Sequence, residues 1–118
     1  LEVQDLPAIV RAATDRSGGR CLVACDNSWA SPFLCKPLRL GADLVVEALS
    51  KHVGGHSDLV LGAVAVKDEA LFRRLKDTAR HLGYGASPDD CWLALRGLGT
   101  LAPRLRQQGE SALVIAGW

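Results

Sequence analysis

Residues 44–58 read LVVEALSKHVGGHSD, and this stretch decides the fold of the chain. Its first three residues, Leu44-Val45-Val46, form an apolar run that predicts a buried strand. The run leads directly to Ser50 and Lys51, and a pair of glycines then breaks the chain. The stretch therefore predicts a strand that places a lysine just beyond its end.

Strands and helices alternate on either side of this stretch. Apolar runs predict a strand buried on both faces at CLVAC, Cys21–Cys25, and another strand at Leu59–Val66. Capping residues predict helices that begin after Asp5, Asp68 and Ser87, and a further helix restarts at Thr100. The stretch 27–37 carries two prolines and no period, so we expect a loop or a broken turn there. Alternating strands and helices indicate an α/β architecture in one domain, with a small three-stranded sheet.

Composition excludes several classes of protein. The chain of 118 residues is 48% hydrophobic and 23% charged, which is typical of globular proteins and excludes a disordered tail or a collagen-like fibre. The net charge of +1 favours neither nucleic acid nor a membrane surface as a partner. No apolar run is long enough to span a membrane, and no targeting peptide is visible. Because the chain opens with Leu1 and contains no methionine, we expect it to be part of a longer translation product.

Cysteine and histidine spacing predicts no metal site. The chain contains four cysteines, Cys21, Cys25, Cys35 and Cys91. They match no CxxC pair and no zinc pattern, and those at 21, 25 and 91 lie in apolar surroundings. We therefore expect small buried hydrophobic residues in a reducing, cytoplasmic setting. His52 and His56 are spaced i, i+4, but the two glycines between them do not allow the helix that zinc-binding pairs use.

Two single residues are candidates for chemistry. Asp26 follows the first predicted strand, and open α/β sheets bind ligands at the carboxyl ends of their strands. Its alternative role is to cap the loop that follows. Lys51 follows a strand that is apolar apart from Glu47, and a lysine near apolar surroundings readily becomes a nucleophile or Schiff-base former. Its alternative is a lysine that ends a strand and points to water.

Five short motifs follow one another in a fixed order along the chain. They are Asp26-Asn27-Ser28-Trp29-Ala30-Ser31-Pro32, Leu40-Gly41-Ala42-Asp43, Ser50-Lys51, Gly54-Gly55-His56-Ser57-Asp58 and Cys91-Trp92-Leu93. In this order the chain resembles the pyridoxal-phosphate (PLP) enzymes of cysteine and methionine metabolism, over essentially all 118 residues. The resemblance implies the aspartate-aminotransferase-like, fold type I architecture: a mostly parallel sheet flanked by helices, with the strand after the lysine antiparallel. Residues 1–118 would then form part of the PLP-binding large domain of a longer chain.

The resemblance also assigns roles to four residues. Lys51 matches the lysine that forms a Schiff base with the cofactor aldehyde and afterwards moves protons on the substrate. Asp26 matches the aspartate that keeps the pyridine nitrogen protonated, so that the ring can accept electrons. Ser28 stands where the family has a hydroxyl near the cofactor's phenolic oxygen. Ser50 matches a hydroxyl that helps hold the phosphate.

Two positions depart from the family pattern. Ala48 stands where a serine usually provides a second phosphate donor, and His52 stands where an aromatic residue usually follows the lysine. One lost neutral hydrogen bond costs about 1 kcal/mol, which weakens cofactor affinity without abolishing it. Since the lysine and the aspartate are both retained, we do not expect an inactive homologue.

Within the family, Trp29 and the run Arg104–Gln108 most resemble the bacterial cystathionine β-lyase branch. That branch implies β-elimination of cystathionine, an amino-acid thioether, to homocysteine, pyruvate and ammonia. The family resemblance also implies a homotetramer of the full-length chain. Two alternatives stay open: a γ-lyase, γ-synthase or sulfhydrylase of the same family, or a truncated, non-catalytic α/β fragment.

Overall fold

The computed structural model describes residues 3–118, and in this part of the chain it forms a three-stranded sheet and six helical segments. The chain divides into two compact units. The first unit is the chain up to Glu47 together with Ala63–Gly85, and the second is Ala48–Gly62 together with Ala86–Trp118. None of the helices among the described residues is long and apolar enough to cross a membrane.

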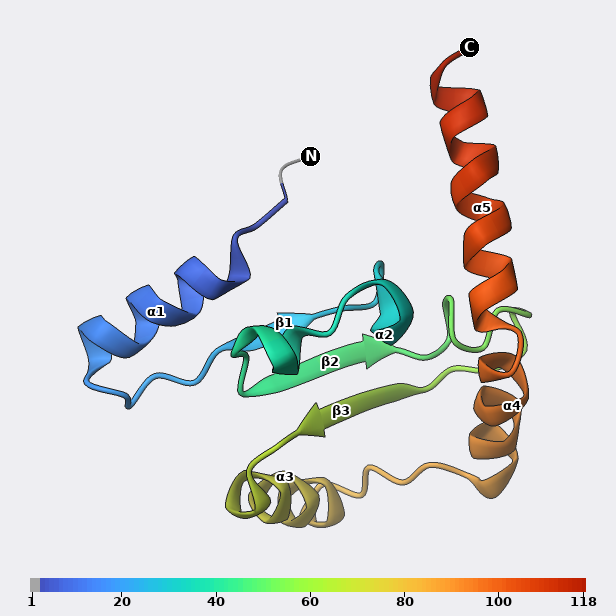
Figure 1. Ribbon diagram of the computed structural model, residues 1–118. Coiled ribbons are helices and arrows are strands. Elements are labelled where there is room, and N and C mark those ends of the chain that lie inside the picture. Colours follow the sequence, from blue (N-terminus) through green and yellow to red (C-terminus); the bar gives the residue numbers. More distant parts are fainter. Residues whose placement is uncertain (1–2) are drawn as a thin grey trace. The chain divides into compact units, whose positions relative to one another are not determined.

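The first unit is built on the sheet, whose strands lie in the order β1-β2-β3. Strand β1 (Ala24–Asp26) is parallel to β2 (Leu44–Ala48), with Asp26 opposite Val46. Strand β3 (Gly62–Val66) runs in the opposite direction to β2 (Figure 1). The predicted α/β architecture and the reversed strand after the lysine are therefore both confirmed.

Four helical segments accompany this sheet: α1 (Leu6–Ser17), α2 (Ser31–Leu34), the 3-10 helix η1 (Pro37–Leu40) and α3 (Glu69–His81). The predicted caps are confirmed, since the Asp5 carboxylate accepts the Ala8 N–H at 3.0 Å and Asp68 accepts the Leu71 N–H at 2.7 Å. The stretch 27–37, expected to be a loop or a broken turn, contains the four-residue α2 and the start of η1. Each of its prolines occupies a first helical turn, where the missing N–H leaves no bond unmade.

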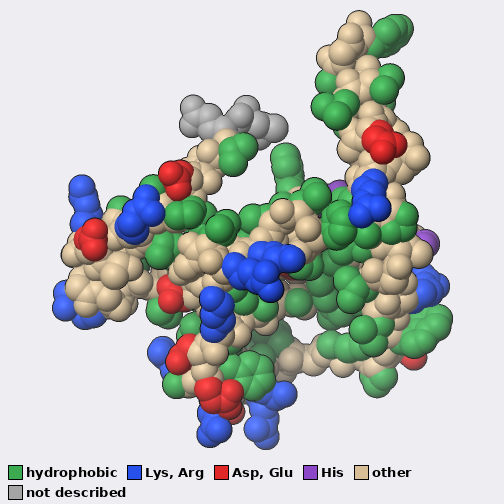
Figure 2. Space-filling view, viewed as in Figure 1, with side chains coloured by type: hydrophobic (Ala, Val, Ile, Leu, Met, Phe, Trp, Pro, Cys, Tyr) green, Lys and Arg blue, Asp and Glu red, His purple; other side chains and the backbone are tan. Residues whose placement is uncertain are grey.

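The second unit packs a turn-rich segment, residues 49–61, with α4 (Pro88–Leu98) and α5 (Leu101–Ala116). Ser87 caps α4 as predicted, by accepting the Asp90 N–H at 3.0 Å. The buried apolar residues of this unit are Val53, Leu59, Ala94, Leu101 and Leu105. In the last turns of α5, by contrast, the apolar side chains at 113–115 are 71–78% exposed and stand out in Figure 2.

Three predictions about strand limits and burial are wrong. The CLVAC run pairs with β2 only from Ala24 onward, because a strand extends only where its neighbour supplies a ladder, and β2 begins at Leu44. With a neighbour on one side only in the described part of the chain, β1 is not buried. The predicted strand at 59–66 begins only at Gly62, since Leu59 belongs to the core of the second unit.

The cysteines are also more exposed than predicted. Cys21 and Cys91 are exposed and Cys25 is half-buried, so the expectation of small buried hydrophobic residues is wrong. Cys21 is exposed because it precedes β1, the part of the run that pairs with a neighbouring strand. Cys91 is exposed because it lies in the first turn of α4, whereas the buried residues of that helix lie in its middle and last turns.

Candidate functional site

Asp26 lies at the carboxyl end of the parallel strand pair in the first unit, as the sequence predicts. Its Oδ1 accepts the Ser28 N–H at 2.9 Å, a side-chain turn that fixes the first residues of the loop. The loop-capping role is therefore real. Asp26 is nevertheless exposed while Ser28 is buried, so the carboxylate combines a backbone cap with access for a ligand.

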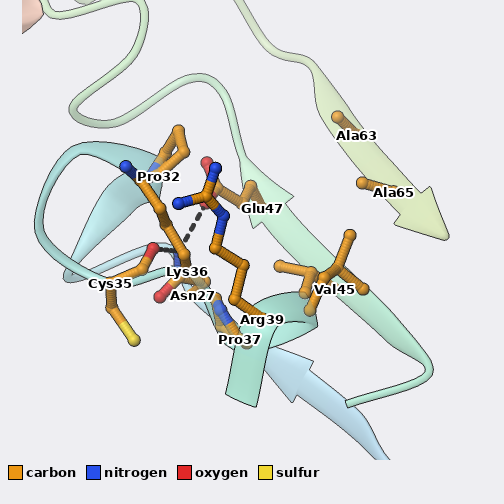
Figure 3. Close-up of a pocket in the computed structure, with 11 residues that line it drawn as sticks. Asn27, Pro32, Cys35, Lys36, Pro37, Arg39, Val45, Glu47, Ala63 and Ala65 are labelled. Atoms are coloured by element: carbon orange, nitrogen blue, oxygen red, sulfur yellow. Dashed lines mark hydrogen bonds between the residues drawn. The ribbon is translucent and has the colours of Figure 1, made fainter. Parts of the chain in front are cut away.

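Asn27 anchors the same loop from the inside. Its side-chain amide donates to Glu47 Oε1 at 2.8 Å and to the Cys35 carbonyl at 3.2 Å (Figure 3). Its backbone N–H donates to the Val46 carbonyl at 2.9 Å, which continues the β1–β2 ladder by one bond. Asn27 therefore ties the residue after Asp26 both to β2 and to the far end of the loop.

Glu47 is the buried partner in this contact, with 9% of its surface exposed. Burial raises the pKa of the Glu47 carboxyl above its ordinary value, the Asn27 hydrogen bond acts in the opposite direction, and the nearby charge of Asp26 raises it further. A cavity of about 430 Å³ lies beside Glu47, and apolar residues such as Val45, Ala63 and Ala65 form much of its lining (Figure 3).

Ser50 and Lys51 come together in the second unit, where they line one cleft of about 260 Å³ with His52, Ser57 and Arg104 among its other residues. Lys51 is exposed and Ser50 is half-buried. The cleft thus combines a primary amine, hydroxyl groups and a guanidinium. An amine is the group that bonds to an aldehyde, and hydroxyl donors suit a phosphate. This donor set fits a cofactor that carries both an aldehyde and a phosphate.

The turn that carries Lys51 is closed by its own glycines. The Gly54 N–H donates to the Leu49 carbonyl at 2.7 Å, and the Gly55 N–H donates to the Lys51 carbonyl at 2.8 Å. His56 Nδ1 lies 2.7 Å from the Gly54 carbonyl oxygen, so this ring is engaged with the backbone. In residues 3–118, no three side chains of His, Cys, Asp or Glu gather where they could share a metal ion.

Arg104, on α5, bonds to the next part of this turn. Its Nη1 donates to the His52 carbonyl at 2.8 Å, and its Nη2 donates to the Val53 carbonyl at 3.3 Å and to the Gly97 carbonyl at 2.8 Å. Gly97 lets α4 approach the turn, because a Cβ there would overlap the backbone oxygens of Val53 and Gly54.

The four predicted site residues therefore form two pairs. Asp26 and Ser28 belong to the first unit, and Ser50 and Lys51 belong to the second. Sequence reasoning missed the Asn27–Glu47 contact, although a lone carboxylate in an apolar strand was a usable signal. It also missed the contacts of Arg104, for which no spacing gave a signal.

Comparison with known proteins matches residues 1–118 to the family described as Cys/Met metabolism PLP-dependent enzyme. A cystathionine beta-lyase of Bordetella avium is 46% identical over 114 residues, which cover 97% of this chain and 28% of that protein. The structure of cystathionine gamma synthase from Xanthomonas oryzae pv. oryzae, in complex with aminoacrylate and cysteine, matches with a TM-score of 0.86 at 40% identity, over 98% of this chain and 30% of the other. Cystathionine gamma-lyase from Lactobacillus plantarum, complexed with L-serine, matches with a TM-score of 0.80 at 37% identity, over 86% of this chain and 26% of the other. The chain thus spans between a quarter and a third of the length of these relatives.

Proposed function

The chain belongs to the Cys/Met metabolism family of PLP-dependent enzymes, and we propose that the protein containing it is a carbon–sulfur lyase that acts on cystathionine by β-elimination. The observation that carries the proposal is the cleft shared by Ser50 and Lys51, which joins an accessible amine to donors suited to a phosphate. The choice of β-elimination is supported by the 46% identity with the Bordetella avium β-lyase.

Four residues hold the cofactor and substrate in this proposal. When bound, PLP supplies an aldehyde and an electron-accepting ring that stabilises negative charge on the substrate Cα. Lys51 would hold the cofactor aldehyde through Nζ, and its amine would take the proton from the substrate Cα. Asp26 would keep a proton on the pyridine nitrogen, and its bond to the Ser28 N–H fixes the carboxylate for that task. Ser50 would donate to the phosphate, and Ser28 would provide the hydroxyl for the phenolic oxygen.

The proposed reaction breaks the bond between Cβ and sulfur. The proton lost from Cα returns to the departing sulfur, which leaves as the thiol of homocysteine. The remaining three-carbon fragment takes up one water and yields pyruvate and ammonia, so that cystathionine and water account for every atom of the three products.

Chemistry at the γ carbon is the second candidate. It is favoured by the cystathionine gamma synthase structure, which matches 98% of this chain with a TM-score of 0.86. A γ-lyase would break the other carbon–sulfur bond and, with one water, release cysteine, 2-oxobutanoate and ammonia. A γ-synthase would instead join cysteine to an activated homoserine.

Product analysis separates these functions. The PLP-loaded protein that contains this chain is incubated with cystathionine, and the keto acids are identified by mass spectrometry. We expect pyruvate and homocysteine in equal amounts, and neither from the Lys51→Ala variant. Release of 2-oxobutanoate and cysteine would replace the proposal with a γ-lyase. Turnover only with cysteine and an acylated homoserine would replace it with a γ-synthase.

A further inference from the structure

The turn after Lys51 presents a row of backbone carbonyls that need hydrogen-bond donors. Those of Leu49 and Lys51 accept the N–H groups of Gly54 and Gly55. The next two carbonyls, those of His52 and Val53, receive donors from Arg104 on α5. Val53 is 6% exposed, and a buried carbonyl left without a donor is costly. Arg104 therefore supplies bonds that the turn does not make for itself.

The guanidinium is itself held in place on three sides. Its Nε donates to Thr100 Oγ1 at 3.0 Å, and its Nη2 donates to the Gly97 carbonyl at 2.8 Å as well as to Val53. The planar fork of arginine matches such a spread of acceptors, whereas the single ammonium of lysine does not span them.

Gly55 makes room for this guanidinium. Its φ is +73°, a backbone conformation that residues with a side chain rarely adopt. A Cβ at this position would overlap the guanidinium of Arg104. The turn that carries Lys51 and the arginine thus fit each other closely, and the arginine lines the same cleft as Lys51 and Ser50.

We propose that Arg104 is a positioning residue for Lys51: by bonding to the His52 and Val53 carbonyls, it fixes the turn that presents the lysine amine and the Ser50 hydroxyl to the cofactor. This inference rests on the proposed function, because it takes Lys51 as the residue that binds PLP. Arg104 acts through the backbone and needs no contact with the substrate.

The test uses the protein containing this chain, with Arg104→Lys and Arg104→Ala variants and Arg73→Ala as the matched control. Arg73 is another helical arginine, and its side chain is 74% exposed and paired with Glu69. Hydrogen exchange of the apo-protein is followed on the peptide spanning 49–58. The dissociation constant of PLP is measured by equilibrium dialysis, well below the unfolding temperature of every variant. Exchange and PLP affinity of Arg104→Ala are measured again with added methylguanidinium.

Loss of the charged donor in Arg104→Ala should speed exchange at Gly54 and Gly55 by about tenfold or more. PLP affinity should fall in parallel, methylguanidinium should restore part of both, and Arg104→Lys should lie between the parent and Arg104→Ala. Arg73→Ala should match the parent. Unchanged exchange, or faster exchange with unchanged PLP affinity, would overturn the inference. The proposed function fails separately, if borohydride does not trap the cofactor on Lys51 of the parent protein.

Discussion

Replacing Asn27 by alanine should loosen the loop that carries Asp26. The buried amide of Asn27 makes two side-chain hydrogen bonds, one to the carboxylate of Glu47 and one to the Cys35 carbonyl. A bond to a charged group contributes about 1.5–3 kcal/mol and a neutral one about 0.5–1.5 kcal/mol, so Asn27→Ala should cost roughly 2–4.5 kcal/mol of local stability. The change leaves the Glu47 carboxylate buried without its donor.

Hydrogen exchange measures this cost locally. The backbone N–H of Asn27 donates to Val46 and that of Ser31 donates to the Asn27 carbonyl, so the peptide 24–35 reports on both ends of the loop. At one pH and relative to the parent, its protected amides should exchange between about 30-fold and about 1,600-fold faster in Asn27→Ala. The control Gln107→Ala removes an exposed amide, which donates to Ser111 Oγ at 3.5 Å, and should leave this peptide unchanged.

A second substitution shows whether the carboxylate is the cause. In the Asn27→Ala background, Glu47→Gln removes the buried charge, so exchange should slow again toward the parent. Exchange in Asn27→Ala within about threefold of the parent would mean that the loop does not depend on these bonds, and the reasoning would be refuted.

Three further predictions follow from the same structure. Borohydride treatment of the PLP-loaded protein should leave a pyridoxyl group on the peptide with Ser50 and His52, and a label on Lys36 or Lys67 instead would contradict the assignment of Lys51. Gly97→Ala should lower the thermal unfolding midpoint, because its Cβ would meet the backbone of the lysine turn. Gly109 lies in a helix with open space around it, so Gly109→Ala should raise the free energy of unfolding by up to about 1 kcal/mol and with it the midpoint. Equal effects of the two substitutions would contradict the close approach of α4. Burial raises the pKa of Glu47 in the folded state, so the folded protein binds this proton more tightly than the unfolded chain does. The bound proton therefore contributes fully to the free energy of unfolding below pH 4.5, the ordinary pKa of the group. That contribution is lost as pH rises through the pKa of the folded state. Glu47→Gln keeps an oxygen that accepts from Asn27 and should abolish that loss, as thermal unfolding midpoints from about pH 4 to pH 8 would show; a parallel profile for parent and variant would contradict it.

Local chemistry made the helices predictable. Asp5, Asp68 and Ser87 cap their helices through bonds to residues three positions along, and such bonds depend only on neighbours in sequence. The order of strands and the placement of Asp26 just at a strand end were also predictable, because apolar runs and the polar residue after them are local signals.

Strand limits and burial were not predictable in the same way. The limits of β1 depend on where β2 begins, 20 residues later in the register, and the exposure of Cys21 depends on what covers the strand. The sequence marked Arg104 only as part of a run that resembles related enzymes. It did not indicate that Arg104 contacts the lysine turn, because the bond to the His52 carbonyl joins residues 52 positions apart. Contacts of that range come from the fold and leave no spacing to find.

The separation between the lysine turn and its arginine has a consequence in time. The ribosome adds about 5–20 residues per second, so Arg104, 52 positions after His52, is synthesised about 3–10 s later. Throughout that interval the carbonyls of His52 and Val53 lack the donors that Arg104 supplies in the folded structure. A nascent chain that has reached α3 already contains Lys51 but not α4 and α5, the two helices of its unit. On the proposal that Arg104 fixes the lysine turn, the ordered turn forms only after α5 has been translated.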